Sequence, residues 1–113
     1  MLSRFKIAGA GVYKPRKVLT SREMDDVHGC AAGWTESEFG IVSRHVAGDA
    51  ETTSIMAAQA ATAALADAGW EGEAVDVIIG GCGVMEQPIP STSALVQDKL
   101  GLGASGIPSF DVN

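Results

Sequence analysis

The sequence predicts an α/β fold in which a mostly parallel sheet packs around a buried, alanine-rich helix. Residues 53–68 form the strongest helix pattern, with Ala, Ile, Met and Leu on every face and Gly69 at the C-terminal end. Residues 75–82 form a continuous apolar run, which is typical of a strand buried on both faces of a parallel sheet. The order strand, helices, strand, helix, strand favours the α/β class.

Local signals predict the remaining elements. Thr20 and Thr35 each begin a capping-box pattern, with a Glu three residues later, and each pattern predicts a short helix that ends at a glycine. The other expected elements are a first strand at 5–12, a loop or irregular strand at 40–48, a helix at 91–100 and a last strand at 107–112.

These elements are too few to cover one another. Three strands and a few short helices cannot enclose an all-apolar helix and also cover both faces of a parallel sheet. We therefore expect the segment to expose large apolar patches unless more chain or a partner covers them.

Composition and charge exclude several classes of function. The 113 residues carry a formal net charge of −6, which argues against nucleic acid or an anionic membrane as partner. No stretch has the roughly 20 apolar residues of a membrane span, and the N-terminus lacks a secretory signal pattern. Cys30, Cys82, His28 and His45 have no metal-ligand spacing, so we expect no metal, and reduced thiols in the cytoplasm.

Gly9 and Gly11 follow the first strand and invite a dinucleotide-binding interpretation. That fingerprint needs a third glycine opening a helix, and Lys14 followed by Pro15 stands there instead. We reject the nucleotide site and expect the two glycines to allow close packing of the strand.

The chain resembles the front part of 3-oxoacyl-acyl-carrier-protein synthase III (beta-ketoacyl synthase III) and its thiolase-fold relatives. Each matching piece is short, but the pieces occur in the family's order and spacing. They are residues 7–15, Trp34, 40–41, 44–45, the helix at 53–68, 75–79, 90–91, 97–101 and 110–112.

The resemblance implies that residues 1–113 are the N-terminal segment of the first α/β half of a thiolase-like condensing enzyme. The catalytic cysteine is expected three residues after Asn113, so this segment contains no catalytic residue and is expected to be inactive alone. The complete protein is expected to be an acyltransferase with a Cys-His-Asn triad. It would join an acyl thioester to a malonyl thioester by decarboxylative Claisen condensation, in fatty-acid or related biosynthesis.

The resemblance also implies the partners. The substrates are thioesters of coenzyme A or of an acyl-carrier protein, and no cofactor is tightly bound. Because an acidic carrier protein docks on basic surface, the scattered Lys and Arg leave the choice between the two open. A homodimer is expected, paired through the last strand: Ser109, Phe110, Asp111, Val112 and Asn113.

Trp34 has two interpretations. It stands six residues before Gly40, where the family has a tryptophan that stacks on the adenine of coenzyme A. It also stands at the position before the predicted cap Thr35, where it would pack on Phe39 as a hydrophobic staple. Glu38 stands where the family usually has an arginine, and its carboxylate would repel a phosphate at that position.

Residues 83–90 correspond to the family's loop that closes the partner's acyl pocket. The resemblance places Met85, Glu86, Gln87 and Ile89 in this substrate pocket. Ile89 replaces a bulky aromatic residue and would admit a longer or branched acyl group, or it is ordinary interface core.

The same loop separates two chemistries. Relatives that condense acyl chains without decarboxylation carry a glutamate base where this chain has Ile89, so decarboxylative chemistry is favoured. Glu86 is the nearby carboxylate that would support the non-decarboxylating alternative, although a solvated loop residue is the simpler interpretation.

Cys82 lacks a neighbouring base and is interpreted as a buried structural thiol. A further alternative is a non-catalytic subunit that binds a catalytic homologue. Any residue other than cysteine at the third position after Asn113 would favour this alternative.

Overall fold

The structure is a computed structural model that describes residues 4–112, and these residues form two compact units. One unit is Lys14–Glu51, and the other combines the N-terminal segment through Tyr13 with the chain from Thr52 onward. Within the described residues no helix is long and apolar enough to cross a bilayer.

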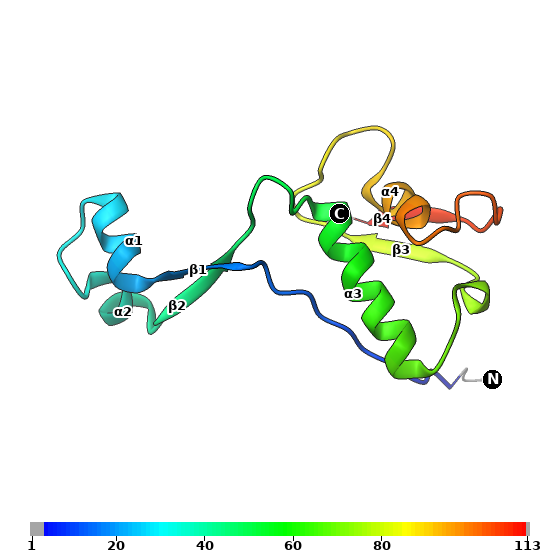
Figure 1. Ribbon diagram of the computed structural model, residues 1–113, viewed down its shortest axis with the longest axis horizontal. Coiled ribbons are helices and arrows are strands. Elements are labelled where there is room, and N and C mark those ends of the chain that lie inside the picture. The colour runs from blue at the N-terminus through cyan, green and yellow to red at the C-terminus, as the bar shows by residue number, and fades with distance from the viewer. Residues whose placement is uncertain (1–3, 113) are drawn as a thin grey trace. The chain divides into compact units, whose positions relative to one another are not determined.

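The unit Lys14–Glu51 contains the strands β1 and β2 and the short helices α1 and α2 (Figure 1). Strands β1 and β2 pair antiparallel, with Lys17 opposite Val46. No sequence pattern predicted β1, and a loop or irregular strand was predicted in the region of β2. In chain order the elements are β1 (Lys17–Thr20), α1 (Ser21–His28), α2 (Trp34–Phe39) and β2 (Ser43–Val46).

The capping box at α1 is confirmed, because the Thr20 N–H donates to Glu23 Oε2 at 2.7 Å and the Glu23 N–H donates to Thr20 Oγ1 at 3.2 Å. The second predicted capping box is wrong, although its helix is present and ends at Gly40. Thr35 does not cap α2, because its hydroxyl donates to the buried carboxylate of Asp25 at 2.6 Å.

Asp25 supplies the missing cap from α1. Its Oδ2 accepts the N–H of Gly33 at 2.8 Å, and its Oδ1 accepts the N–H of Thr35 at 2.9 Å. The Thr35 hydroxyl and these backbone donors lower the pKa of Asp25, since each stabilises the ionised form. A carboxylate ten residues away therefore joins α1 to α2.

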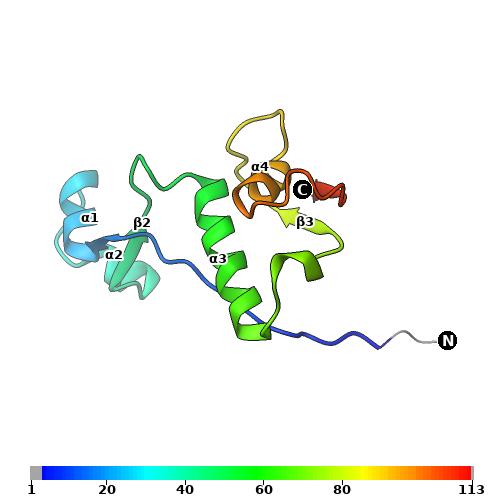
Figure 2. The ribbon, with the colours of Figure 1, turned by 45° about the vertical axis from the view of Figure 1, so that its right-hand side comes forward.

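The second unit is built on helix α3 and a parallel strand pair (Figures 1 and 2). Strands β3 and β4 pair with Ile78 opposite Ser109 and Gly81 opposite Val112, which confirms the parallel arrangement of the last two strands. Helix α4 contacts α3, β3 and β4. The elements are α3 (Thr53–Ala68), the 3-10 turn η1 (Gly72–Ala74), β3 (Ile78–Gly81), α4 (Thr92–Lys99) and β4 (Ser109–Val112).

The expected mostly parallel sheet is not formed. The described residues contain one antiparallel and one parallel two-stranded sheet, so the architecture is mixed α/β. The predicted first strand at 5–12 joins neither sheet. It lies along α3 instead, where the Ala10 N–H donates to Asp67 Oδ2 at 2.9 Å.

Gly9 and Gly11 make this close approach possible. A Cβ on Gly9 would lie 2.5 Å from the carbonyl oxygen of Ala64, and one on Gly11 would be closer than 3.0 Å to backbone atoms of Ala60 and Ala64. The small residues of α3 and the glycines of the segment thus allow the two backbones to pack closely. This confirms the role that the sequence analysis predicted for Gly9 and Gly11.

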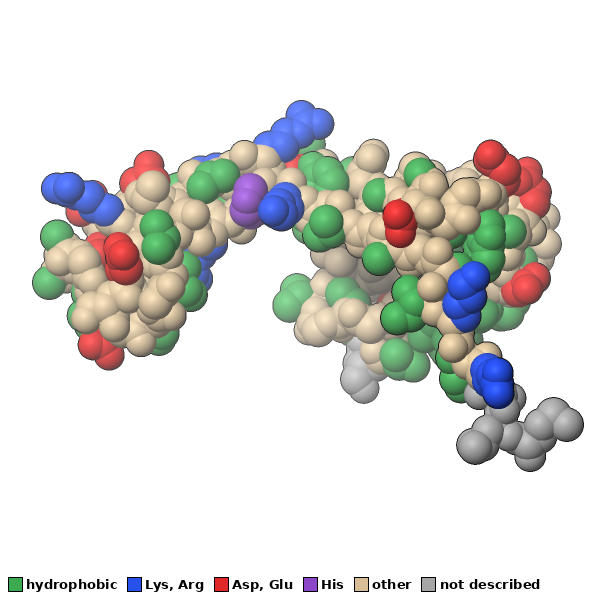
Figure 3. Space-filling view, turned by 90° about the horizontal axis from the view of Figure 1, so that it is seen from below, with side chains coloured by type: hydrophobic (Ala, Val, Ile, Leu, Met, Phe, Trp, Pro, Cys, Tyr) green, Lys and Arg blue, Asp and Glu red, His purple; other side chains and the backbone are tan. Residues whose placement is uncertain are grey.

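The predicted burial of α3 is wrong for the described residues. Within this helix only Ser54 and Ala58 are buried. Across residues 4–112, the buried apolar side chains are those of Ala58, Val96 and Leu102. Too few elements surround the helix, and Figure 3 shows hydrophobic side chains open at the surface, which agrees with the expected apolar patches.

Candidate functional site

The loop that follows β3 lies at the edge where the two parallel strands end. Because Gly81 and Val112 are register partners, the carboxyl ends of β3 and β4 lie side by side. Such an edge is where open α/β sheets bind ligands. A hollow of 530 Å³ opens there, and its lining residues are Gly81, Cys82, Gly83, Met85 and Val112.

The predicted pocket residues occupy this loop, but they differ in their surroundings. Met85 lines the hollow and is 46% exposed, whereas Ile89 is 87% exposed and contributes nothing to its wall. The half-buried side chain of Gln87 donates to the carbonyl oxygen of Ile89 at 3.0 Å, a contact that stays inside the loop.

Glu86 makes a contact that leaves the loop. Its Oε2 accepts the backbone N–H of Ser54, at the start of α3, at 2.8 Å. The Ser54 hydroxyl, followed by its N–H, lowers the pKa of the Glu86 carboxyl, because both stabilise the ionised form. The lowered pKa makes the Glu86 carboxylate a weaker base than an ordinary glutamate.

Asp111 forms a second carboxylate junction, at the start of α4. Its oxygens accept the N–H groups of Thr92 and Ser93, both at 2.9 Å, and the Ser93 hydroxyl at 2.5 Å. The hydroxyl, followed by the Ser93 N–H, lowers the pKa of Asp111. Gly80 is the register partner of Asp111 on β3, and a Cβ at this position would clash with the side chains of Ser93 and Asp111.

The other predicted interface residues lie on the same strand. Phe110 and Val112 are 45% and 54% exposed, and Ser109 is half-buried. Within residues 4–112, β3 is the only strand paired with β4, on one of its two edges. Asn113 lies outside the described residues.

Trp34 belongs to the unit Lys14–Glu51, at the start of α2, and is 44% exposed. Its ring meets that of Phe39 edge to face, with centroids 5.5 Å apart and planes at 84°. The expected contact with Phe39 is confirmed, but Trp34 is the first helical residue rather than the one before the cap. Part of the indole ring is exposed to solvent, and its stacking on adenine stays a prediction.

The cysteines and histidines form no catalytic or metal group in the described part of the chain. No set of three or more His, Cys, Asp or Glu side chains there could hold a metal ion. Cys82 is half-buried rather than buried, and its thiol donates to the carbonyl oxygen of Val84 at 2.8 Å. Cys30 is also a free thiol, and His45 contacts the carbonyl oxygen of Pro15 at 2.6 Å.

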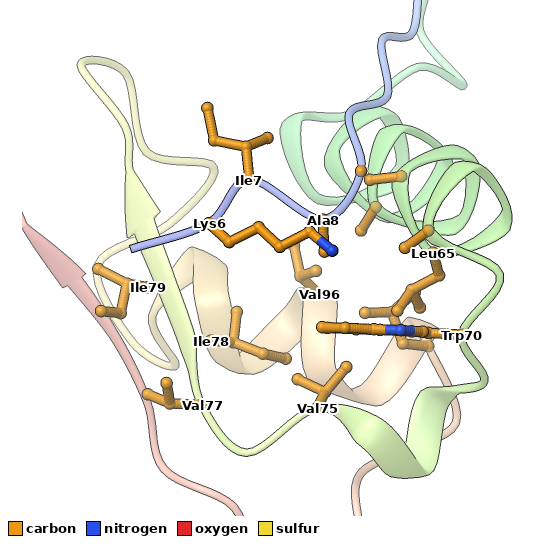
Figure 4. Close-up of a pocket in the computed structure, with 15 residues that line it drawn as sticks. Lys6, Ile7, Ala8, Leu65, Trp70, Val75, Val77, Ile78, Ile79 and Val96 are labelled. Atoms are coloured by element: carbon orange, nitrogen blue, oxygen red, sulfur yellow. The ribbon is translucent and has the colours of Figure 1, made fainter. Parts of the chain in front are cut away.

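A second hollow, of 510 Å³, lies between the N-terminal segment and β3 (Figure 4). Ile7 and Ala8 lie on one side, and Val75 and Ile78 lie on the other, with Trp70 at one end. Its single charged lining residue is Lys6. Ligand sites combine apolar walls with several convergent polar groups, so we interpret this hollow as uncovered core surface.

Comparison with known proteins identifies relatives over nearly the whole chain. Beta-ketoacyl-[acyl-carrier-protein] synthase III from Rhodospirillum centenum is 39% identical over 109 residues, which are 96% of this chain and 33% of that protein. The same enzyme from Neisseria meningitidis is 37% identical over 107 residues, which are 95% of this chain and 33% of that protein. No protein-family model matches the sequence.

Solved structures agree. The crystal structure of 3-oxoacyl-[acyl-carrier-protein] synthase III from Aquifex aeolicus superposes with a TM-score of 0.86 at 36% identity, over 95% of this chain and 34% of that one. A variant of OleA from Xanthomonas campestris gives 0.81 at 28% identity, over 94% and 33%. The chain thus spans about a third of the length of the relatives it matches.

Proposed function

The chain belongs to the beta-ketoacyl-[acyl-carrier-protein] synthase III family as a partial segment of the thiolase-like fold, and we propose that it forms part of a condensing acyltransferase. The observation that carries the proposal is the sequence match to these enzymes across 96% of the chain. The hollow at the carboxyl ends of β3 and β4 supports it as a place for an acyl group near the expected cysteine.

The proposed reaction has two stages. A cysteine thiolate, expected beyond Asn113, attacks an acyl thioester and releases coenzyme A or a carrier-protein thiol. A malonyl thioester then loses carbon dioxide, and the resulting carbanion attacks the acyl group, so that a 3-oxoacyl thioester forms and the cysteine is released. The described residues supply scaffold, the acyl-pocket loop and the strand that leads toward the nucleophile.

Named residues take specific roles in this proposal. Met85 and Ile89 help to close the acyl pocket of the partner copy, with the Gln87 side chain bracing the backbone at Ile89. Trp34 stacks on the adenine of coenzyme A, while Phe39 braces its ring. The edge of β4 that is unpaired within residues 4–112 pairs with its copy in a homodimer, since an exposed strand edge offers a row of backbone donors and acceptors.

A second candidate is condensation without decarboxylation, which needs a general base. Glu86 is the carboxylate of the loop, but its contact with Ser54 and its lowered pKa argue against that role. Decarboxylation requires no such base, so the geometry favours it.

The first measurement is the intact mass of the purified protein under denaturing conditions, because a mass several times 11.6 kDa is required for an enzyme of the relatives' length. The protein is then given an acyl-coenzyme A and a malonyl thioester. The proposal predicts 3-oxoacyl product and carbon dioxide in equal amounts. Product without carbon dioxide would favour the second candidate. A residue other than cysteine three positions after Asn113, with no product, would favour a non-catalytic subunit.

A further inference from the structure

Glu86 stands near the middle of the acyl-pocket loop, residues 83–90, which lies between β3 and α4. The apolar side chains of this loop do little to hold it, because Val84 is 81% exposed and Ile89 is 87% exposed. The side-chain hydrogen bonds of Cys82 and Gln87 end within the loop itself. A loop with these features opens easily unless something outside it holds it.

The contact partner of Glu86 is rigid. Ser54 is fully buried and lies in the first turn of α3, the 16-residue helix of this unit. The first N–H groups of a helix have no partner inside the helix and attract negative charge. The Glu86 carboxylate reaches one of these groups across 32 positions of sequence.

The helix needs this external partner. The N-cap residue of α3 is Thr52, and in the described part of the chain its side chain makes no capping hydrogen bond to the helix. The Thr52 hydroxyl lies 3.4 Å from the Ser54 hydroxyl instead. In contrast, α4 is capped by its own Ser91, whose hydroxyl oxygen accepts the N–H of Ala94 at 3.2 Å. Glu86 therefore takes the place of a local cap on α3.

The geometry points to Glu86 as a positioning residue that anchors the acyl-pocket loop to the start of α3 and thereby sets acyl-chain selectivity. Met85, its immediate neighbour, lines the hollow at the ends of β3 and β4. A shift of Glu86 moves Met85 and the rest of the loop with it, which changes the space available to an acyl chain in the pocket that the loop closes. The selectivity part rests on the proposed function, whereas the anchoring part concerns the structure alone.

The test uses the full-length protein and two variants of Glu86. Glu86→Ala removes the acceptor, and Glu86→Gln keeps an oxygen that can accept from the Ser54 N–H but removes the charge. Asp76→Ala is the matched control, because Asp76 is exposed in the same unit and its side chain makes no hydrogen bond within residues 4–112. Ser54→Ala removes one donor and completes a double-mutant cycle with Glu86→Ala.

The first readout is hydrogen exchange of amides in residues 83–89, which does not depend on catalysis. Anchoring predicts faster exchange in Glu86→Ala, an intermediate rate in Glu86→Gln, and no change in Asp76→Ala. It also predicts that Glu86→Ala adds less exchange in the Ser54→Ala background than in the original protein. Equal exchange in Glu86→Ala and Asp76→Ala would overturn the proposal.

The second readout is the ratio of kcat/KM for long and short acyl primers. Anchoring predicts that Glu86→Ala changes this ratio by about tenfold, with partial rescue in Glu86→Gln. A catalytic base predicts instead that both variants lose about 10²–10⁴-fold in turnover with every primer while loop exchange is unchanged, which would also overturn the proposal. If the original protein condenses no thioester, the proposed function fails, and hydrogen exchange still decides whether Glu86 is an anchor.

Discussion

A single methyl group added at Gly11 tests the packing of the N-terminal segment on α3. In Gly11→Ala the new Cβ would lie closer than 3.0 Å to the carbonyl oxygen of Ala60 and the nitrogen of Ala64. Both are backbone atoms of a regular helix and cannot rotate away. The segment must therefore retreat by roughly 1 Å to restore ordinary contact distances.

Two terms decide the size of the effect. Overpacking of this kind costs about 1–3 kcal/mol. The loss of glycine freedom in the unfolded chain offsets about 0.4–1 kcal/mol of that cost. The difference between these terms is about 0–2.6 kcal/mol, so we expect the free energy of unfolding to fall by about 1 kcal/mol, which is a factor of about 5 in the ratio of folded to unfolded protein.

The assay is urea denaturation of the protein carrying Gly11→Ala or the matched variant Gly83→Ala. Gly83 does not have a positive φ, and an added Cβ there meets no atom within 4 Å. Gly83→Ala should leave the midpoint unchanged or raise it slightly, whereas Gly11→Ala should lower it at an unchanged slope. Equal midpoints for the two variants would refute the close approach of the segment to α3.

The remaining predictions concern Asp111, Trp34 and Ile89. Hydrogen bonds from Ser93 hold the pKa of Asp111 below its ordinary value of about 3.9, so its contribution to stability is complete above that pH and is lost as the pH falls. Unfolding followed from pH 7 to pH 3 should therefore show a weaker acid loss in Asp111→Asn than in the original protein. Trp34→Ala should raise KM for coenzyme A thioesters, whereas Phe39→Ala should lower stability with a smaller change in KM. If Trp34→Ala leaves KM equal to that of the original protein, Trp34 does not bind coenzyme A and only packs against Phe39. Ile89→Phe should favour short primers without loss of stability, because Ile89 is 87% exposed, and an unchanged primer profile would remove Ile89 from the pocket wall.

Prediction from sequence succeeded where the signal was local. Thr20 and Glu23 stand three residues apart and form their capping box, and Gly69 has the positive φ that ends α3. Both depend on groups within one helical turn, where spacing alone determines which atoms meet. The same kind of signal failed at Thr35, because Asp25, ten residues away, competes for its hydroxyl.

The candidate site was predicted less completely. Its loop was found through family resemblance, and Met85 lies in the hollow. The roles of Ser54 and Ser93 were missed, although a hydroxyl residue at a helix start is a weak sign of a nearby acceptor. Their partners are Glu86 and Asp111, 32 and 18 residues away, and no local pattern joins such positions.

The sequence by itself indicated the family through short motifs in the family's order and spacing. Apolar periodicity, caps and glycines located the helices, although not the start of α2, and a continuous apolar run indicated the parallel pairing of β3 with β4. The tertiary structure alone decided which carboxylates meet which helix starts, and that residues 5–12 lie on α3 rather than in a sheet. An isolated charge or glycine is compatible with many partners, and packing brings one of them within hydrogen-bonding or contact distance.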